Sequence, residues 1–307
     1  IGFVNNQAKN TIVIGAHYDH LGYGEEGSLY RGERAIHNGA DDNASGTAAM
    51  IELARRLKVS GPKTNNYLFI AFSGEEKGLL GSNHFVKNTT LDLSTINYMI
   101  NLDMVGRLKP DDKTLILSGS RTSPRFKTLI DSIAVDSIRI KSSDSGVGPS
   151  DHTSFYLQHV PVLHFFSGTH ADYHKPSDDA DRINYEGEIA IMKMILNTID
   201  LTANDGKIPF SKTKDDENEN APKFKVTLGV VPDYTYDGEG MRIDGVTDGK
   251  PAAKAGFESG DVVIQIGEYR VVDMMSYMKA LGKFNRGDAA KVKIRRGKEE
   301  LEKDVVF

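Results

Sequence analysis

The sequence has 307 residues, 39% of them hydrophobic and 26% charged, with a formal net charge of −5 and a pI near 6.0. This composition is typical of a globular protein large enough for two domains, and it shows neither the basic excess of nucleic-acid-binding proteins nor an apolar run near the roughly 20 residues of a membrane-spanning helix. There is no cysteine, so disulfides, cysteine-bound zinc and thiol nucleophiles are excluded, and any metal must be bound by His, Asp or Glu.

The first residues, Ile1 to Val4, have the pattern of an interior strand. They show neither an initiator methionine nor a signal-peptide pattern. We therefore expect that the native N-terminus and any targeting signal lie outside this sequence. The localisation that we favour is export, either to a periplasm or out of the cell.

The first two-thirds of the chain alternates short runs of β-branched and aromatic residues with helical stretches. The predicted strands are Thr11–Ala16, Tyr67–Phe72, Ile96–Leu102, Thr114–Leu117 and Pro161–Phe165. The predicted helices are Ala44–Val59, Lys77–Lys87, Pro124–Val135 and Tyr185–Thr202. Buried strands separated by helices predict an α/β fold with a largely parallel mixed sheet flanked by helices. In such sheets ligands bind beyond the carboxyl ends of the strands.

The composition changes after this region, and the run Lys212–Asn220 contains no hydrophobic residue. Such a segment cannot bury apolar surface, which is typical of a solvated linker. We expect a larger domain at residues 1–205, a linker at 206–222 and a small β-rich domain at 223–307. All nine histidines lie between His17 and His174, so any metal chemistry belongs to the larger domain.

Five short segments each place a carboxylate or an imidazole just past a predicted strand or at the start of a helix. They are His17–His20, Gly39–Gly46, Ser73–Glu76, Asn101–Met104 and Tyr173–Asp178. All five fall at one edge of the predicted sheet. Together they supply two imidazoles and several carboxylates, which suits a two-zinc hydrolytic site.

Taken singly, each segment also has a purely structural explanation. The alternatives are a helix cap for Asp42 or Asn43, helix-dipole acids for Glu75 and Glu76, a turn residue for Asp103 and hydrogen-bonded structural histidines for His17 and His174. Five independent coincidences at one sheet edge are improbable. The metal-site interpretation is therefore favoured.

In this order and spacing the segments HYDH, GADDNASG, GEE, NLDM and YHKPSD resemble the co-catalytic two-zinc aminopeptidases, whose clan includes glutamate carboxypeptidase II and the transferrin receptor ectodomain. The resemblance covers roughly residues 10–200. It implies two Zn²⁺ cofactors and the metal ligands His17, Asp42, Glu76, Asp103 and His174. Asp42 would bridge both ions, and its peptide bond to Asn43 would be cis.

The resemblance also implies roles for residues that do not bind metal. Glu75 would be the general base and acid acting on a metal-bound hydroxide, beside the metal ligand Glu76. Tyr173 resembles a hydrogen-bond donor to the tetrahedral oxyanion. The expected reaction is removal of N-terminal residues from peptides.

Two carboxylates resemble groups that orient the imidazole ligands. Asp19 would orient His17, and Asp178 would orient His174. His37 precedes the bridging-aspartate loop and is not expected to be a ligand.

Asp151 and His152 resemble a family segment near the substrate pocket, the alternative being a helix cap beside a partly exposed histidine. A carboxypeptidase or dipeptidase of the same clan is the main alternative function. It would need a cation for the substrate carboxylate, which Arg107, Arg121 or Arg125 can supply. A non-enzymatic peptide-binding protein and a single-zinc glutaminyl cyclase are disfavoured, because no expected ligand is missing.

From about Lys223 the chain resembles a PDZ domain. Leu228, Gly229 and Val230, at the end of a predicted strand from Lys225, resemble its carboxylate-binding loop. The predicted helix Val272–Leu281 would line a groove that binds the C-terminus of a peptide. The alternative is a lid or packing module without a free ligand.

Overall fold

The computed structural model describes residues 1–213, 226–233, 236, 238–247 and 249–307. By their contacts the residues group into two units, which are considered separately below. The first unit holds Ile1–Tyr23 and Ile36–Glu217, and the second holds Gly24–Ala35 and Asn218–Phe307.

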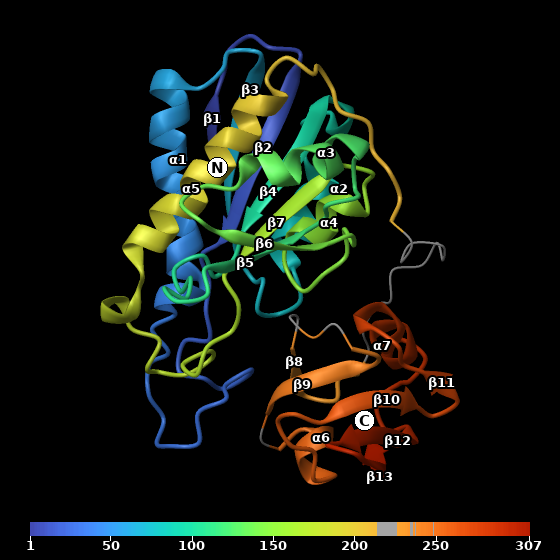
Figure 1. Ribbon diagram of the computed structural model, residues 1–307. Helices are drawn as coiled ribbons and strands as arrows, with labels where there is room; N and C mark the ends of the chain where they lie inside the picture. The colour runs from blue at the N-terminus through green and yellow to red at the C-terminus, as the bar shows by residue number, and fades with distance from the viewer. Residues whose placement is uncertain (214–225, 234–235, 237, 248) are drawn as a thin grey trace. The chain divides into compact units, whose positions relative to one another are not determined.

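A seven-stranded sheet with the strand order β1-β3-β2-β4-β7-β5-β6 forms the centre of the first unit. The strands are β1 (Gly2–Val4), β2 (Asn10–His17), β3 (Asn65–Phe72), β4 (Ile96–Leu102), β5 (Thr114–Ser118), β6 (Arg139–Ser143) and β7 (Val162–Phe166). The central strands β3, β2, β4 and β7 run parallel, whereas β1 and β5 pair antiparallel with β3 and β7 (Figure 1). The predicted mixed, largely parallel sheet is confirmed.

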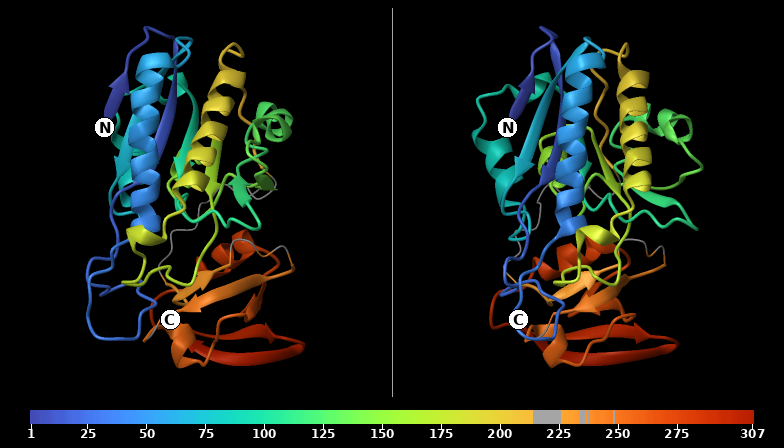
Figure 2. Two further views of the ribbon diagram at one scale, coloured as in Figure 1. Left: turned by 60° about the vertical axis from the view of Figure 1, so that its left-hand side comes forward. Right: turned by 90° about the vertical axis from the view of Figure 1, so that its left-hand side faces the viewer.

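Helices cover both faces of this sheet. On one face lie α1 (Gly46–Ser60), α3 (Pro124–Ile133) and α5 (Tyr185–Thr202), and on the other lie α2 (Leu80–Asn88) and α4 (His152–Tyr156). In β2, Ile12 and Ile14 pack with α1 and α5, while Val13 packs with the residues of α2 and α4. Alternate residues of a strand face opposite sides, so a strand covered on both faces is apolar throughout. Figure 2 shows α1 and α5 side by side on their face.

Two helices begin later than the sequence predicts. α2 begins at Leu80 because Gly78 and Leu79 have φ values of 98° and 59°, which are incompatible with a right-handed helix. α1 begins at Gly46, after a turn over Ala40–Ser45 in which Asp42 (φ −107°, ψ 87°) and Asn43 (φ −136°, ψ 46°) have non-helical backbone angles. Both differences lie at the edge of the sheet where the candidate site forms.

The chain continues to pack on the first unit after α5. Ile208 is buried in the core, and its backbone N–H donates to Asn97 Oδ1 at 2.9 Å. The N–H of Thr213 donates to the hydroxyl of Tyr156 at 2.8 Å. The structure thus differs from the expected linker at residues 206–213, because apolar and hydrogen-bonding residues precede the polar run. Residues 214–222 lie outside the described residues.

The second unit contains an antiparallel sheet of order β13-β12-β10-β9-β8, with β11 paired to β10. Its elements are β8 (Val230–Pro232), β9 (Met241–Val246), α6 (Pro251–Lys254), β10 (Val262–Ile266), β11 (Tyr269–Arg270), α7 (Met274–Leu281), β12 (Ala289–Arg296) and β13 (Glu299–Val306). Leu228, Ile243, Val263 and Tyr277 are among its buried core residues. Among the helices of the described residues, none combines the length and hydropathy needed to cross a bilayer.

Two predictions for this unit are corrected. The strand expected from Lys225 to Val230 begins at Val230, and Lys225 itself lies outside the described residues. Gly229 has a φ of 72°, and its carbonyl accepts from the N–H of Thr247, so this backbone forms a loop rather than a strand. The helix expected from Val272 begins at Met274, after a capping box made by Asp273.

Candidate active site

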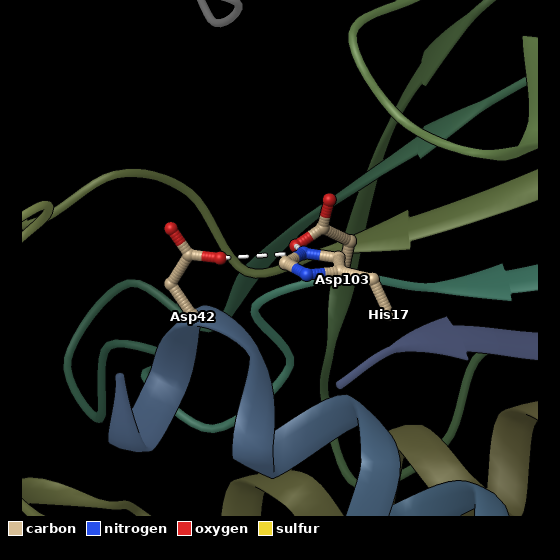
Figure 3. Close-up of side chains that lie close together, drawn as sticks. All are labelled: His17, Asp42 and Asp103. Atoms are coloured by element: carbon tan, nitrogen blue, oxygen red, sulfur yellow. Dashed lines mark hydrogen bonds and ion pairs between the residues drawn. The ribbon is translucent and has the colours of Figure 1, made fainter. Parts of the chain in front are cut away.

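One group of ligand atoms lies beyond the carboxyl ends of β2 and β4. His17 is the last residue of β2, and its Nε2 atom lies 3.2 Å from Asp103 Oδ1 and 3.3 Å from Asp42 Oδ1 (Figure 3). Asp103 directly follows β4, and Asp42 lies in the turn before α1. The three atoms come from segments far apart in sequence, and the parallel register of β2 and β4 brings the two strand ends together.

A second group faces the other oxygen of the same aspartate. His174 Nε2 lies 3.1 Å from Asp42 Oδ2 and 3.3 Å from Glu76 Oε2. Asp42 therefore presents one oxygen to His17 and Asp103 and the other to His174 and Glu76. The five residues named as metal ligands from the sequence are all brought together here.

The Asp42 carboxylate is held in place by its neighbour Asn43. The Asn43 side chain donates to the carbonyl of Leu102 at 3.0 Å and accepts from the N–H groups of Gly46 and Met104 at 3.0 and 3.1 Å. A Cβ at Gly46 would lie 2.6 Å from the Leu102 carbonyl oxygen, so a glycine is required at this contact. The turn before α1 is thus tied to the end of β4. The Asp42–Asn43 peptide bond is cis, as expected.

Asp178 is fully buried beneath the same turn. Its Oδ2 atom accepts from the backbone N–H groups of Asp41 and Asp42 at 2.9 and 3.1 Å. Its Oδ1 atom lies 3.9 Å from a guanidinium nitrogen of Arg107 and 4.0 Å from His170 Nε2. The structure therefore places Asp178 against the backbone that carries the shared aspartate.

Asp19 contacts both His17 and the loop after β3. His17 Nδ1 lies 3.1 Å from the backbone carbonyl of Asp19 and 3.8 Å from its carboxylate oxygen Oδ1. The same Oδ1 atom accepts from the N–H of Glu75 at 3.2 Å. Asp19 thereby connects the imidazole at the end of β2 with the carboxylates that follow β3.

Burial and the neighbouring charged groups together set the pKa values of Asp42 and Glu75. Burial alone would raise the pKa of Asp42, but hydrogen bonds from His17 and His174 outweigh it and hold the pKa far below its usual value. Burial raises the pKa of Glu75 well above its usual range; His17 opposes this, and the Asp103 carboxylate adds to it. The two carboxylates therefore differ in how readily each takes up a proton.

Tyr173 packs on the neighbouring imidazole of His174. The rings of Tyr173 and His174 are stacked with centroids 3.9 Å apart and planes inclined by 24°. His174 has a φ of 54°, a left-handed conformation that is uncommon for residues other than glycine. The turn and the stacked ring together direct the imidazole toward Asp42.

His20 is a site residue that the sequence interpretation did not identify. Its Nδ1 atom lies 2.8 Å from Glu76 Oε1 and 3.9 Å from Asp42 Oδ2, and its ring centroid is 5.8 Å from that of His174. The only sequence signal was its place in the HYDH segment. The His37 ring lies farther out, with its centroid 6.4 Å from that of His20.

The Asp151–His152 pair forms a buried layer near Asp103 rather than an exposed cap. Both residues are fully buried, and Asp151 makes no side-chain cap to α4. The His152 ring stacks on His164 with centroids 4.4 Å apart. Burial lowers the pKa of His164 to about 4, so this imidazole is neutral at ordinary pH. The alternative of a helix cap beside a partly exposed histidine is therefore wrong, because the His152 ring is buried against His164 of β7.

The donor set and its spacing fit two metal ions. Only His and carboxylate donors are present, which zinc accepts, and ligand atoms about 2.0–2.1 Å from a tetrahedral zinc lie roughly 3.3 Å apart. The separations of His17 Nε2 from Asp42 and Asp103, and of His174 Nε2 from Asp42 and Glu76, are all 3.1–3.3 Å. Each oxygen of Asp42 then belongs to a separate group of donors, which is the arrangement of a bridging carboxylate.

The sequence also matches known families. Residues 1–199 match the description "Peptidase family M28", which is more than half of the chain. The chain belongs to this family. Residues 210–306 match a PDZ domain. The resemblance inferred from the five segments and from the C-terminal region is confirmed.

Relatives of this M28 chain include proteins named as aminopeptidases. Aminopeptidase YwaD of Bacillus subtilis (strain 168) is 31% identical over 196 residues, which cover 59% of this chain and 39% of that protein. The LapA aminopeptidase of Legionella pneumophila superposes with a TM-score of 0.54 at 25% identity, over 66% of this chain and 53% of that one. The zinc aminopeptidase BSAP of Bacillus subtilis has a TM-score of 0.51 at 28% identity, over 66% and 49% of the two chains. This chain thus spans about half or less of the length of these relatives.

Proposed function

We propose that the chain is a zinc aminopeptidase that binds two Zn²⁺ ions. The observation that carries this proposal is the orientation of Asp42, whose two oxygens face different pairs of donors. One zinc would be bound by His17, Asp103 and Asp42 Oδ1. The other would be bound by His174, Glu76 and Asp42 Oδ2.

The bound zinc ions would polarise the scissile carbonyl and lower the pKa of a water molecule. Glu75 is adjacent in sequence to the proposed ligand Glu76, but it belongs to neither group of donors around Asp42. Its raised pKa suits a carboxylate that accepts a proton from water and returns it to the leaving amine. Tyr173, stacked on His174, is the proposed hydroxyl donor to the oxyanion.

Hydrolysis from the amino end is favoured over a carboxypeptidase reaction. Arg121 is exposed and pairs with Asp144 at 2.9 Å, and Arg125 pairs with Asp205. Arg107 is bound to Asp172 at 3.2 Å. These three cations, the candidates for a substrate carboxylate, are each engaged with a carboxylate of the protein. Names of relatives that include "aminopeptidase" point in the same direction.

For the second unit we propose binding of a peptide C-terminus at Leu228, Gly229 and Val230. Gly229 has a φ of 72°, and a Cβ there would lie 2.1 Å from the Cβ of Lys250, so the loop requires glycine. The Gly229 N–H donates to the Thr227 hydroxyl at 2.9 Å, so a peptide carboxylate would take the place of this oxygen as its acceptor. The match of this region to a PDZ domain supports a peptide-binding use of the loop.

The deciding experiment measures metal content and substrate preference on the same preparation. Elemental analysis is expected to find close to two zinc ions per chain, and chelation should abolish activity that added zinc restores. Aminoacyl-nitroanilides and peptides amidated at the C-terminus should be cleaved, whereas N-acetylated peptides should not. Cleavage of N-acetylated peptides with loss of activity on amidated ones would instead identify a carboxypeptidase.

A further inference from the structure

The two oxygens of Glu76 have different partners. Oε2 lies 3.3 Å from His174 Nε2, at the separation shared by the other donor pairs around Asp42. Oε1 lies 2.8 Å from His20 Nδ1. The second distance is that of a hydrogen bond, and it is shorter than the roughly 3.3 Å edge of a tetrahedral zinc site.

This difference separates His20 from the ligands. His174 lies at 3.1 and 3.3 Å from the nearest oxygens of Asp42 and Glu76, as two ligands of one ion would. The Nδ1 atom of His20 lies within 4.8 Å of ligand atoms of both Asp42 and Glu76, but only Glu76 is within hydrogen-bond distance, since Asp42 Oδ2 is 3.9 Å away. A carboxylate oxygen can only accept, so the Nδ1 atom of His20 is the donor.

His20 is fixed in this position by its surroundings. Its side chain is 9% exposed, and its ring packs against the backbone of Gly39, where a Cβ would lie 2.6 Å from the ring carbon Cγ. Gly39 also has a φ of 62°. The Nε2 atom of His20 is buried and has no hydrogen-bond partner among the described residues. Nδ1 is therefore the nitrogen through which this buried imidazole acts on the site.

We propose that His20 is a positioning residue, which donates from Nδ1 to Glu76 Oε1 and so turns Oε2 toward the metal shared with His174 and Asp42. This inference rests on the proposed two-zinc function. Such outer hydrogen bonds fix the direction of a ligand, and their loss typically lowers metal affinity by about 10–100-fold. His20 touches neither substrate nor metal in this role.

The test compares three variants of the full chain. In His20→Leu the side chain is still branched at Cγ but has no hydrogen-bond donor. In His20→Asn the side-chain amide keeps an N–H donor at the position of Nδ1. His84→Leu is the control, because His84 is an exposed histidine of α2 outside the site. Zinc affinity is measured by competition of the metal-free protein with a chromophoric chelator, and the Co²⁺-loaded proteins are compared by visible absorption.

His20→Leu is expected to bind the more weakly held of its two zinc ions about 10–100-fold less tightly than the wild type and to alter the Co²⁺ spectrum. His20→Asn and His84→Leu should stay close to the wild type in both measurements. An unchanged affinity in His20→Leu would overturn the inference. So would an equal loss in His20→Asn, which would make the imidazole itself a ligand. A wild-type protein that takes up only one zinc would overturn the two-zinc function, and the inference with it.

Discussion

At the level of single residues, the adjacent glutamates Glu75 and Glu76 have different surroundings. Glu76 lies within 3.3 Å of His174, whereas the backbone of Glu75 is held by Asp19 and its carboxyl has a raised pKa. Neighbouring carboxylates can thus divide metal binding and proton transfer between them.

Glu75→Gln is expected to lower kcat by about 10²–10⁴-fold, because the amide cannot take the proton, while zinc content stays at the wild-type level. Glu76→Gln should instead lose one zinc. Steady-state kinetics and elemental analysis of both variants measure these effects. Exchanged phenotypes would show that the two roles are assigned in the wrong order.

The residues at this site differ in how far the sequence could predict them. His17, Asp42, Asp103 and His174 each stand at a strand end or helix start, so the parallel sheet brings them together. His20 could not be assigned in this way. Its contact with Glu76 depends on the conformations of the loops after β2 and β3. The hydrophobic periodicity of the sequence does not predict these conformations.

At the level of elements, the turn before α1 depends on contacts from distant segments. Asp178 accepts hydrogen bonds from two backbone N–H groups of this turn, those of Asp41 and Asp42. Asp41 Oδ1 accepts in turn from the N–H of Gly106 at 2.7 Å. The position of the shared aspartate is therefore set by hydrogen bonds to two other loops, in which Asp178 accepts from the turn and Gly106 donates to it.

Asp178→Ala is expected to lower zinc affinity by about 10–100-fold, because both N–H groups lose their acceptor and the turn can shift. Asp178→Asn is the matched control, since its amide oxygen can still accept from both groups. Chelator competition gives the affinities of the two proteins. An alanine variant as tight as the wild type would show that the turn keeps its position without Asp178.

Helix α5 carries a buried acid that makes stability depend on pH. Glu188 is 7% exposed; burial and, to a smaller extent, the Asp41 carboxylate raise its pKa to about 7. The unfolded chain has the ordinary, lower pKa, so between about pH 4.5 and 7 the folded state holds more protons and stability falls as pH rises.

Glu188→Gln removes this titration. The change that this substitution makes in the free energy of unfolding is expected to be about 1–2 kcal/mol more stabilising at pH 8 than at pH 4. This range allows for partial screening of the charge by solvent. Urea unfolding at both pH values measures the difference. Glu186→Gln, at an exposed position of the same helical turn, is the control and should show little change. An effect of Glu188→Gln that is equal at both pH values would contradict the raised pKa.

The strands that could be predicted from the sequence are those whose residues are buried on both faces. The central strands are apolar on both faces, and their bounds agree with the prediction to within about two residues. The edge strand β6, Arg139–Ser143, was not predicted, because it is mainly exposed and polar. The helix α4, His152–Tyr156, has five residues and is too short for a helical period to be visible.

At the level of the whole molecule, all proposed metal ligands come from the first unit. Its core residues extend to Ile208, and Thr213 is still hydrogen-bonded to Tyr156. A truncation after residue 205 would remove these contacts. A test of the second unit should therefore keep residues 1–213.

Residues 1–213 are expected to retain two zinc ions and to cleave a dipeptide-sized substrate with a kcat/KM within about threefold of the full chain. A long peptide should be cleaved less well, because a tethered groove raises the local concentration of a peptide without changing the chemical barrier. The measurement is kcat/KM for both substrates, with and without residues 214–307. As a control, Gly229→Val in the full chain should impair only the long peptide, since this loop has a φ of 72° and no room for a side chain. Equal losses on both substrates after truncation would show that the second unit supports the fold of the peptidase rather than its choice of peptide.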